Sequence, residues 1–210
     1  MSYIKEYLNV IPEQLCDEII NKFNQRRFSS LPVTDLNSMT DKLVEDIFII
    51  PKNDTEWNRI EQFLYKALLL KINNYKKVLL TNLLNMKDPD ILVLLNKNMF
   101  LDNFKIIKIS NNNPDIIFNN YMKNNNRYNI LTFIFYLNDV ENGGKVMVTD
   151  DSVQFLDDKN NYSDTCNIVP EKKKLLLLSE IIPNTYKFMS PISNIQYIIT
   201  GQICENMINL

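Results

Sequence analysis

Apolar residues near the start of the chain recur at the three- and four-residue spacing of a helix. Pro12 and the acidic Glu13 are typical of a helix start, because proline suits the first turn and a carboxylate suits the helix dipole. The pattern then continues through Leu15 and Ile19 to Phe23. It predicts one amphipathic helix, followed by a loop over residues 29–40, which are rich in turn-forming residues.

A second, longer helix is predicted to begin after Asp54 or Thr55, since either side chain can cap its first turn. Its apolar stripe is expected to pack against the outer face of the larger sheet. A further short helix is expected over residues 79–86. The stripe of the long helix comprises Trp57, Ile60, Phe63, Leu64, Ala67, Leu68 and Ile72.

The second half of the chain has the apolar and β-branched runs of strands. Residues 129–137 are apolar on both faces, which predicts a strand buried between two layers. Asn142, Gly143 and Gly144 predict a tight turn, because glycine adopts positive φ without strain. Helices followed by short strands favour an α+β fold with a double sheet. The remaining predicted strands cover residues 104–109, 145–149, 175–178 and 196–200.

Composition narrows the function classes. The chain has 210 residues, 45% of them hydrophobic, which indicates a single globular domain spanning residues 1–210. Its net charge of −2 lacks the basic excess of nucleic-acid binders. The apolar runs at residues 91–95 and 133–137 are too short to span a membrane. No signal peptide precedes the first helix, so a soluble cytoplasmic protein is expected.

Cysteine, glycine and lysine usage adds three smaller expectations. The three cysteines form no CxxC pair, so a zinc site is disfavoured and buried structural thiols are expected. Only three glycines occur, while Asn, Ile, Lys and Tyr are abundant, a bias typical of AT-rich genomes such as those of large DNA viruses or protists. The run Lys172, Lys173 and Lys174 is interpreted as a solvated face.

Residues 131–144, LTFIFYLNDVENGG, resemble the central strand and turn of prolyl-4-hydroxylase-like 2-oxoglutarate/Fe(II) dioxygenases, which read T-x-x-x-Y-L-N-D-x-x-x-G-G. Three further segments agree in order. Residues 7–17 resemble the family's opening helix, residues 168–178 its V-x-P-x-x-G strand, and residues 190–199 the strand after its distal histidine. The resemblance covers most of the chain and is strongest over residues 104–203.

This resemblance implies a double-stranded β-helix flanked by N-terminal helices. Residues 1–100 are expected to form a mainly helical support, and residues 101–210 the β-helix core. The family binds Fe(II) through two histidines and one carboxylate, and it grips 2-oxoglutarate with a basic residue. The chain contains no histidine. The resemblance therefore predicts the fold without the family's metal site.

The positions of the family's ligands can be carried onto this chain. The His-x-Asp pair falls within residues 118–123, the distal histidine at Lys187 or Tyr186, and the cosubstrate anchor near Gln196 or Tyr197. The segment at residues 118–123 is either a repurposed pocket or a solvated, Asn-rich loop. The predicted vestigial pocket comprises Asn119, Asn120, Tyr121, Met122, Tyr136, Lys187, Gln196 and Tyr197.

Three functions remain open from these residues. The first is a catalytically inactive, prolyl-hydroxylase-like protein that binds a protein partner and uses no cofactor, as a viral protein engaging or mimicking a host factor would. The second is an oxygenase whose metal is held by Asp, Glu, Tyr or Cys instead of histidine. The third is a structural or assembly protein, for which a homo-oligomer would be expected.

Overall fold

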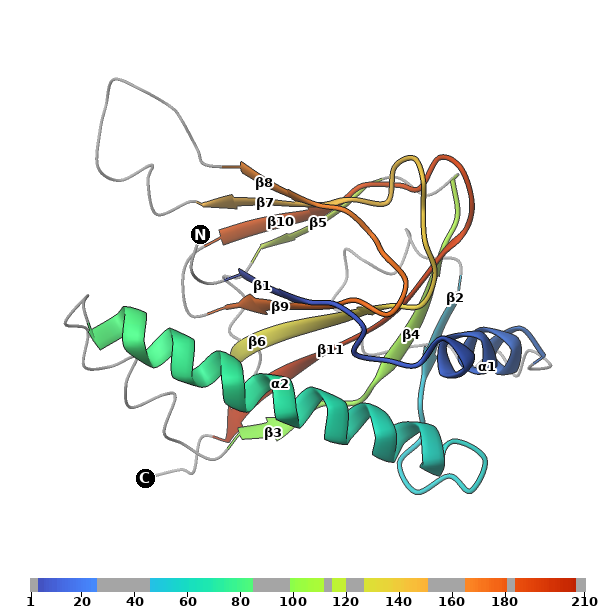
Figure 1. Cartoon of the computed structure of the whole chain (residues 1–210), viewed down its shortest axis with the longest axis horizontal. Helices are drawn as coiled ribbons and strands as arrows, with labels where there is room; N and C mark the ends of the chain where they lie inside the picture. The colour runs from blue at the N-terminus through green and yellow to red at the C-terminus, as the bar shows by residue number, and fades with distance from the viewer. Residues whose placement is uncertain are drawn as a thin grey trace.

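Two antiparallel β-sheets and two helices make up the described part of the chain (Figure 1). The computed structural model describes residues 4–25, 46–84, 99–111, 115–119, 127–150, 165–180 and 184–206.

The larger sheet has seven strands in the order β1-β9-β6-β11-β4-β2, with β3 beside the far part of β11. Its strand β11 runs from Gln196 to Asn206 and pairs with β6 over most of its length. The bounds of the others are β1 Ile4–Tyr7, β2 Asp46–Ile49, β3 Met99–Leu101, β4 Lys105–Ile109, β6 Arg127–Tyr136 and β9 Leu175–Ser179.

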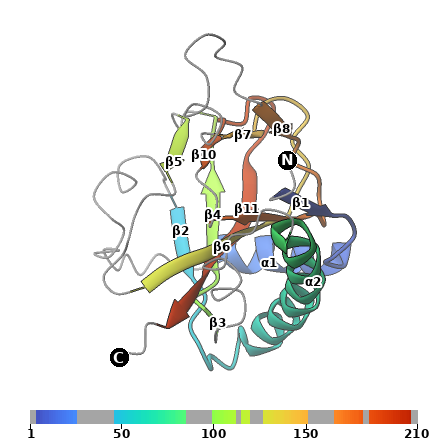
Figure 2. The same cartoon turned by 90° about the vertical axis from the view of Figure 1, so that its left-hand side faces the viewer.

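The smaller sheet has four strands in the order β5-β10-β7-β8. It lies over one face of the larger sheet, and the long helix α2 lies on the opposite face (Figures 1 and 2). The strands are β5 Ile116–Asn119, β7 Val146–Asp150, β8 Thr165–Ile168 and β10 Asn184–Phe188, and the helices are α1 Glu13–Gln25 and α2 Asn58–Leu84.

Strand β6 separates two apolar clusters. Ile134 and Tyr136 belong to the cluster between the sheets, whereas Leu131, Phe133 and Phe135 belong to the cluster under the helices. Successive side chains of a strand point to opposite faces, so a strand between two layers needs apolar residues on both. The predicted strand over residues 129–137 is confirmed, as is the α+β class.

The start of the long helix agrees with its prediction. Asp54 caps it, because its Oδ1 accepts the backbone N–H groups of Glu56 at 2.8 Å and Trp57 at 3.2 Å. The helix differs from its prediction in two other respects. Phe63 lies outside the buried stripe, with 36% of its surface exposed. No separate helix begins at residue 79, because α2 continues to Leu84 and Tyr75, 1% exposed, extends the buried stripe beyond Ile72. No proline or glycine lies between Ile72 and Leu84 to end the helix earlier.

Strands β1, β2 and β3 were not expected within the first hundred residues. Each pairs with a strand far along the chain, as when Ile4 lies opposite Leu178 in β9. A run of about four residues carries little sequence signal for a strand, because pairing with a distant partner, and not the local pattern, stabilises it. The predicted loop over residues 29–40 lies outside the described residues. Within the described residues, neither helix is long and apolar enough to cross a membrane.

Candidate functional site

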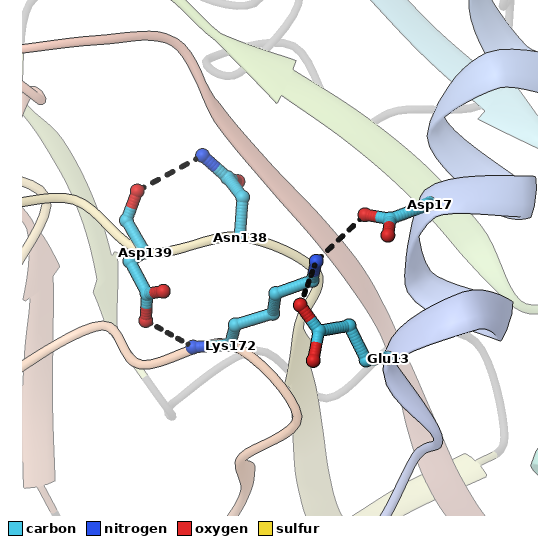
Figure 3. Close-up of polar contacts among 5 residues, drawn as sticks. All are labelled: Glu13, Asp17, Asn138, Asp139 and Lys172. Carbon is cyan, nitrogen blue, oxygen red and sulfur yellow. Dashed lines mark hydrogen bonds and ion pairs between the residues drawn. The ribbon is translucent and has the colours of Figure 1, made fainter.

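The motif that carries the resemblance holds one end of the sheets together. Asn138 Oδ1 accepts the backbone N–H of Tyr197 at 2.7 Å, and its Nδ2 donates to the carbonyl of Ile195 at 2.8 Å. Asp139 Oδ1 accepts the backbone N–H of Lys172 at 2.7 Å (Figure 3). These two side chains therefore fasten the turn after β6 to the loops before β9 and β11. Their role at this end is structural.

The lysine run is not a uniformly solvated face, so that prediction is wrong. Lys172 Nζ lies 2.7 Å from Asp17 Oδ1 and 3.3 Å from Glu13 Oε1, which ties the first turns of α1 to this loop (Figure 3). Lys174 is only 5% exposed, and its Nζ lies 2.8 Å from Glu6 Oε2. Alternation along β9 turns Lys174 toward the space between the sheets.

Lys173 occupies the position at which the resembling family has the glycine of V-x-P-x-x-G. Its φ is +73°, in the left-handed region that glycine adopts most easily. We expect Lys173→Gly to raise the free energy of unfolding by about 0.5–1 kcal/mol, because the strain relieved exceeds the entropy cost of glycine. Urea denaturation of the variant measures this change.

The matched control for this substitution is Lys172→Gly. Lys172 has no positive φ and makes the two ion pairs to α1, so its loss is expected to lower stability. Equal destabilisation by the two variants would contradict the assignment of Lys173 to the glycine position.

At the opposite end of the sheets, the structure brings together two segments expected to carry the family's metal ligands. In the β5–β10 pair, Asn119 lies opposite Thr185 and Phe118 opposite Tyr186. The end of β5 and the start of β10 are thus direct neighbours, although 66 residues separate Asn119 from Thr185 along the chain. Three of the predicted pocket residues (Asn120, Tyr121 and Met122) lie outside the described residues.

Of the two candidates for the distal-histidine position, Tyr186 is the one that points between the sheets. It belongs to the inner cluster with Phe188 and is 4% exposed. Lys187, between them, faces the other way and pairs with Asp115 at 2.7 Å. That ion pair, together with the backbone N–H of Ser190, lowers the pKa of Asp115. The expectation that Lys187 lines the pocket is therefore corrected.

Tyr186 is part of a polar network centred on Glu180, the residue after β9. Glu180 Oε1 accepts hydrogen bonds from Thr132 Oγ1, from Tyr186 Oη at 3.3 Å and from Gln202 Nε2 at 3.5 Å. The network joins β6, β9 and β11 of the larger sheet to β10 of the smaller one. Burial raises the pKa of Glu180, although these hydrogen bonds act in the opposite direction.

Sequence reasoning did not identify Glu180. Its signal was the alternation along β9, which puts residue 180 on the same face as Leu176 and Leu178 of the inner cluster. A carboxylate at the end of such a face is costly to bury and so marks a candidate functional position.

The two candidates for the cosubstrate anchor, Gln196 and Tyr197, also face opposite sides of the larger sheet. Gln196 is fully buried on the strand face of Ile198, between the sheets, and its Nε2 donates to the carbonyl of Gly144 at 3.0 Å. Tyr197 instead packs under the helices, where its hydroxyl donates to Asn24 Oδ1 at 3.2 Å. Tyr197 does not line the interior, because neighbouring residues of a strand face opposite sides.

Tyr136, the tyrosine of the YLND motif, fills the interior. Its side chain is fully buried in the inner cluster, and burial raises the pKa of its phenol. Within the described part of the chain, Tyr136 Oη and Gln196 Oε1 have no hydrogen-bond partner. Tyr136 and Gln196 both lie between the sheets.

The residues present do not fit Fe(II) as the resembling family holds it. A facial triad needs two imidazoles, and the chain has no histidine. Glu180 supplies one carboxylate, but the groups bonded to it are a hydroxyl, a carboxamide and a phenol whose pKa is raised by burial. No three His, Cys, Asp or Glu side chains of the described ranges gather closely enough to share a metal ion.

The anchor position is equally unsuited to 2-oxoglutarate. A carboxylate of the cosubstrate needs a cation to offset its desolvation. Gln196 carries no charge, and its amide nitrogen is already bonded to Gly144. Lys174, a lysine of the described residues that faces the interior, is already paired with Glu6.

No family model matches the chain, and no curated protein matches its sequence. Several solved structures do match the chain. A viral collagen prolyl hydroxylase from Paramecium Bursaria Chlorella virus-1 matches with a TM-score of 0.59 at 11% identity, covering 97% of this chain and 96% of that one. A Trichoplax adhaerens prolyl hydroxylase, solved with a hypoxia inducible factor peptide, gives 0.60 at 15% identity and covers 98% and 84%.

A prolyl-4-hydroxylase from Pseudomonas putida gives a TM-score of 0.56 at 12% identity, covering 97% of this chain and 92% of that one. Three prolyl hydroxylases thus align with nearly the whole described architecture. At these identities the likeness establishes the fold alone, which is that of prolyl-4-hydroxylase-like 2-oxoglutarate oxygenases.

Proposed function

From the fold that the chain shares with prolyl-4-hydroxylases, we propose that it is a catalytically inactive protein built on a double-stranded β-helix, and that it acts by binding. The observation that carries the proposal is the network of Glu180, Tyr186 and Thr132. Tyr186, one of the two candidates for the distal-histidine position, belongs to this network, and the polar groups of the network bond to one another.

The second support is the anchor position. Gln196 faces the interior without a charge, so the anchor candidate that the structure describes there does not supply the cation that holds the cosubstrate in the family. Oxygenase chemistry requires both groups at once. A protein that keeps the scaffold and lacks both can still present its surface to a partner.

The test is thermal unfolding of the purified protein under anaerobic conditions, with Fe(II), Mn(II) or Zn(II), each with and without 2-oxoglutarate. A ligand that binds only the folded state raises the melting temperature. We expect no metal-dependent shift and no further shift with 2-oxoglutarate. A stoichiometric metal-dependent shift that 2-oxoglutarate increases would overturn the proposal and favour an oxygenase with non-histidine ligands.

Glu180→Gln serves as the matched variant in this assay. If metal bound through the carboxylate of Glu180, the shift would vanish in the variant. A shift that persists in Glu180→Gln comes from acidic residues elsewhere and does not concern this site.

The proposed binding partner is a protein in the cytoplasm. If the chain is viral, the partner is a protein of the host. A structural role is the remaining alternative. The oligomeric state in solution distinguishes the two, because an assembly protein would show a mass that increases with concentration.

A further inference from the structure

A groove on the outer side of the larger sheet is separate from the interior described above. It has a volume of about 250 Å³ and lies between α2, β3 and the end of β11. The two elements α2 and β3 are near neighbours at the bottom of Figure 1. Its walls are mostly apolar and include Tyr65, Leu69, Ile72, Met99 and Leu101. The volume is below the range of about 300–1,000 Å³ typical of drug-sized ligands, so it suits a small ligand.

The groove exposes apolar side chains of α2 that the described residues leave uncovered. Leu69 is 45% exposed and Tyr65 is 49% exposed, although α2 already buries a full stripe of apolar residues against the sheet. One isolated exposed apolar residue needs no explanation, but Leu69 and Tyr65 are exposed in the same hollow, which indicates a binding surface.

Lys76 gives the groove a charge at one end. It lines the same hollow as Leu69, about 10 Å further along the helix axis. The surrounding protein partly desolvates its ammonium and lowers the pKa of Lys76. Among the described residues, Lys76 has no ion-pair or hydrogen-bond partner. An ammonium that loses water and gains no partner is complementary to a carboxylate supplied from outside.

We propose that this groove binds a small molecule with an apolar body and a terminal carboxylate, of the class of medium-chain fatty acids. The carboxylate pairs with Lys76, and the chain lies along Leu69 toward Tyr65. The proposal goes beyond the proposed function and rests on it only in taking binding as the role of the chain. It requires neither the interior of the sheets nor a metal.

The test is a calorimetric titration of the full chain with octanoate. The octanoate concentration is kept below the value at which octanoate aggregates. Octylammonium has the same chain and the opposite charge, and acetate has the carboxylate without the chain. We expect octanoate to bind at least tenfold more tightly than either, since both the chain and the charge contribute. ¹⁵N-labelled protein should show shifts of the amide signals confined to the groove.

Two variants locate the site. Lys76→Met keeps the apolar stem and removes the charge, and it is expected to weaken octanoate binding about tenfold. Lys66→Met is the matched control, because Lys66 is exposed on the same helix and does not line the groove. It should leave binding unchanged.

Equal binding of octanoate and octylammonium, or unchanged binding in Lys76→Met, would overturn the proposal, as would no binding at all. None of these outcomes would bear on the metal and 2-oxoglutarate assay, which concerns the interior between the sheets.

Discussion

Gly143→Val is expected to lower the free energy of unfolding by about 3–5 kcal/mol, the largest loss among the substitutions considered. Gly143 has a φ of +78°, which a β-branched residue resists. A Cβ at this position would lie 2.4 Å from the carbonyl oxygen of Ser190 and 2.7 Å from the backbone nitrogen of Ile192. Both contacts are with backbone, so neither can be relieved by a change of rotamer.

The loss matters because the turn at Gly143 joins distant parts of the chain. Gly143 forms a bridge with Pro191, and the neighbouring Gly144 donates its N–H to the carbonyl of Ser190 at 3.1 Å. These contacts fix the loop before β11. A single domain is stable by only about 5–15 kcal/mol, so the variant would lose a large part of that total.

Urea denaturation followed by circular dichroism measures the change, with Gly144→Ala as the comparison. Gly144 also has a positive φ, of +64°, but a Cβ there would meet Gln196 Oε1 at 3.0 Å, the end of a side chain that can shift. We expect the smaller loss for Gly144→Ala. A Gly143→Val variant within about 1 kcal/mol of the parent would contradict the close approach of these loops.

Glu180→Gln is expected to stabilise the protein at neutral pH, because burial disfavours the carboxylate that it replaces. The carboxamide keeps the size of the side chain and an oxygen that can accept from Thr132, Tyr186 and Gln202. It removes the charge that burial opposes. The gain would indicate that the carboxylate is held at a cost in stability.

The pH dependence follows from the direction of the shift. Burial raises the pKa of Glu180 above its ordinary value of 4.5, so the unfolded chain loses this proton at a lower pH than the folded one. Stability from this group is therefore highest below pH 4.5, falls as the pH rises, and levels off above the folded pKa. Tyr186, the titratable neighbour in the network, has a raised pKa and stays neutral in this range.

The measurement is the stability of the parent and of Glu180→Gln at a series of pH values from acidic to neutral. The difference between them isolates Glu180 from other titrating groups, such as Asp115, whose lowered pKa acts in the opposite direction. We expect the difference to be small in acid and to grow toward neutral pH. A difference that does not change with pH would contradict the raised pKa.

Much of the fold could be predicted because its signals are local. The cap at Asp54, the buried strand over residues 129–137 and the turn at Gly143 each depend on a few neighbouring residues. The short strands β1, β2, β3, β5, β8 and β10 could not be predicted. Their pairing partners are not adjacent in the chain, and three to five residues carry too little pattern to identify them.

The candidate site was predicted at the level of segments and missed at the level of side chains. The sequence named residues 118–123 and Tyr186 or Lys187 as candidate ligand positions, although not as strands, and the structure pairs Phe118 with Tyr186. Lys187 was assigned to the interior, where Tyr186 lies instead, because a shift of one residue moves a side chain to the other face. Glu180 was missed, since its hydrogen-bond partners Thr132 and Gln202 come from strands distant in the chain.

The sequence by itself determined that no histidine is available to hold a metal, that the chain folds as a helical and β-stranded domain, and that its turn motif resembles prolyl hydroxylases. These conclusions need only composition and local pattern. The tertiary structure alone decided that Asn138 and Asp139 fasten loops, that Lys173 has the backbone of a glycine, and that Glu180 lies between the sheets. Strand register and the packing of two layers set these features, and both arise from contacts between residues distant in the chain.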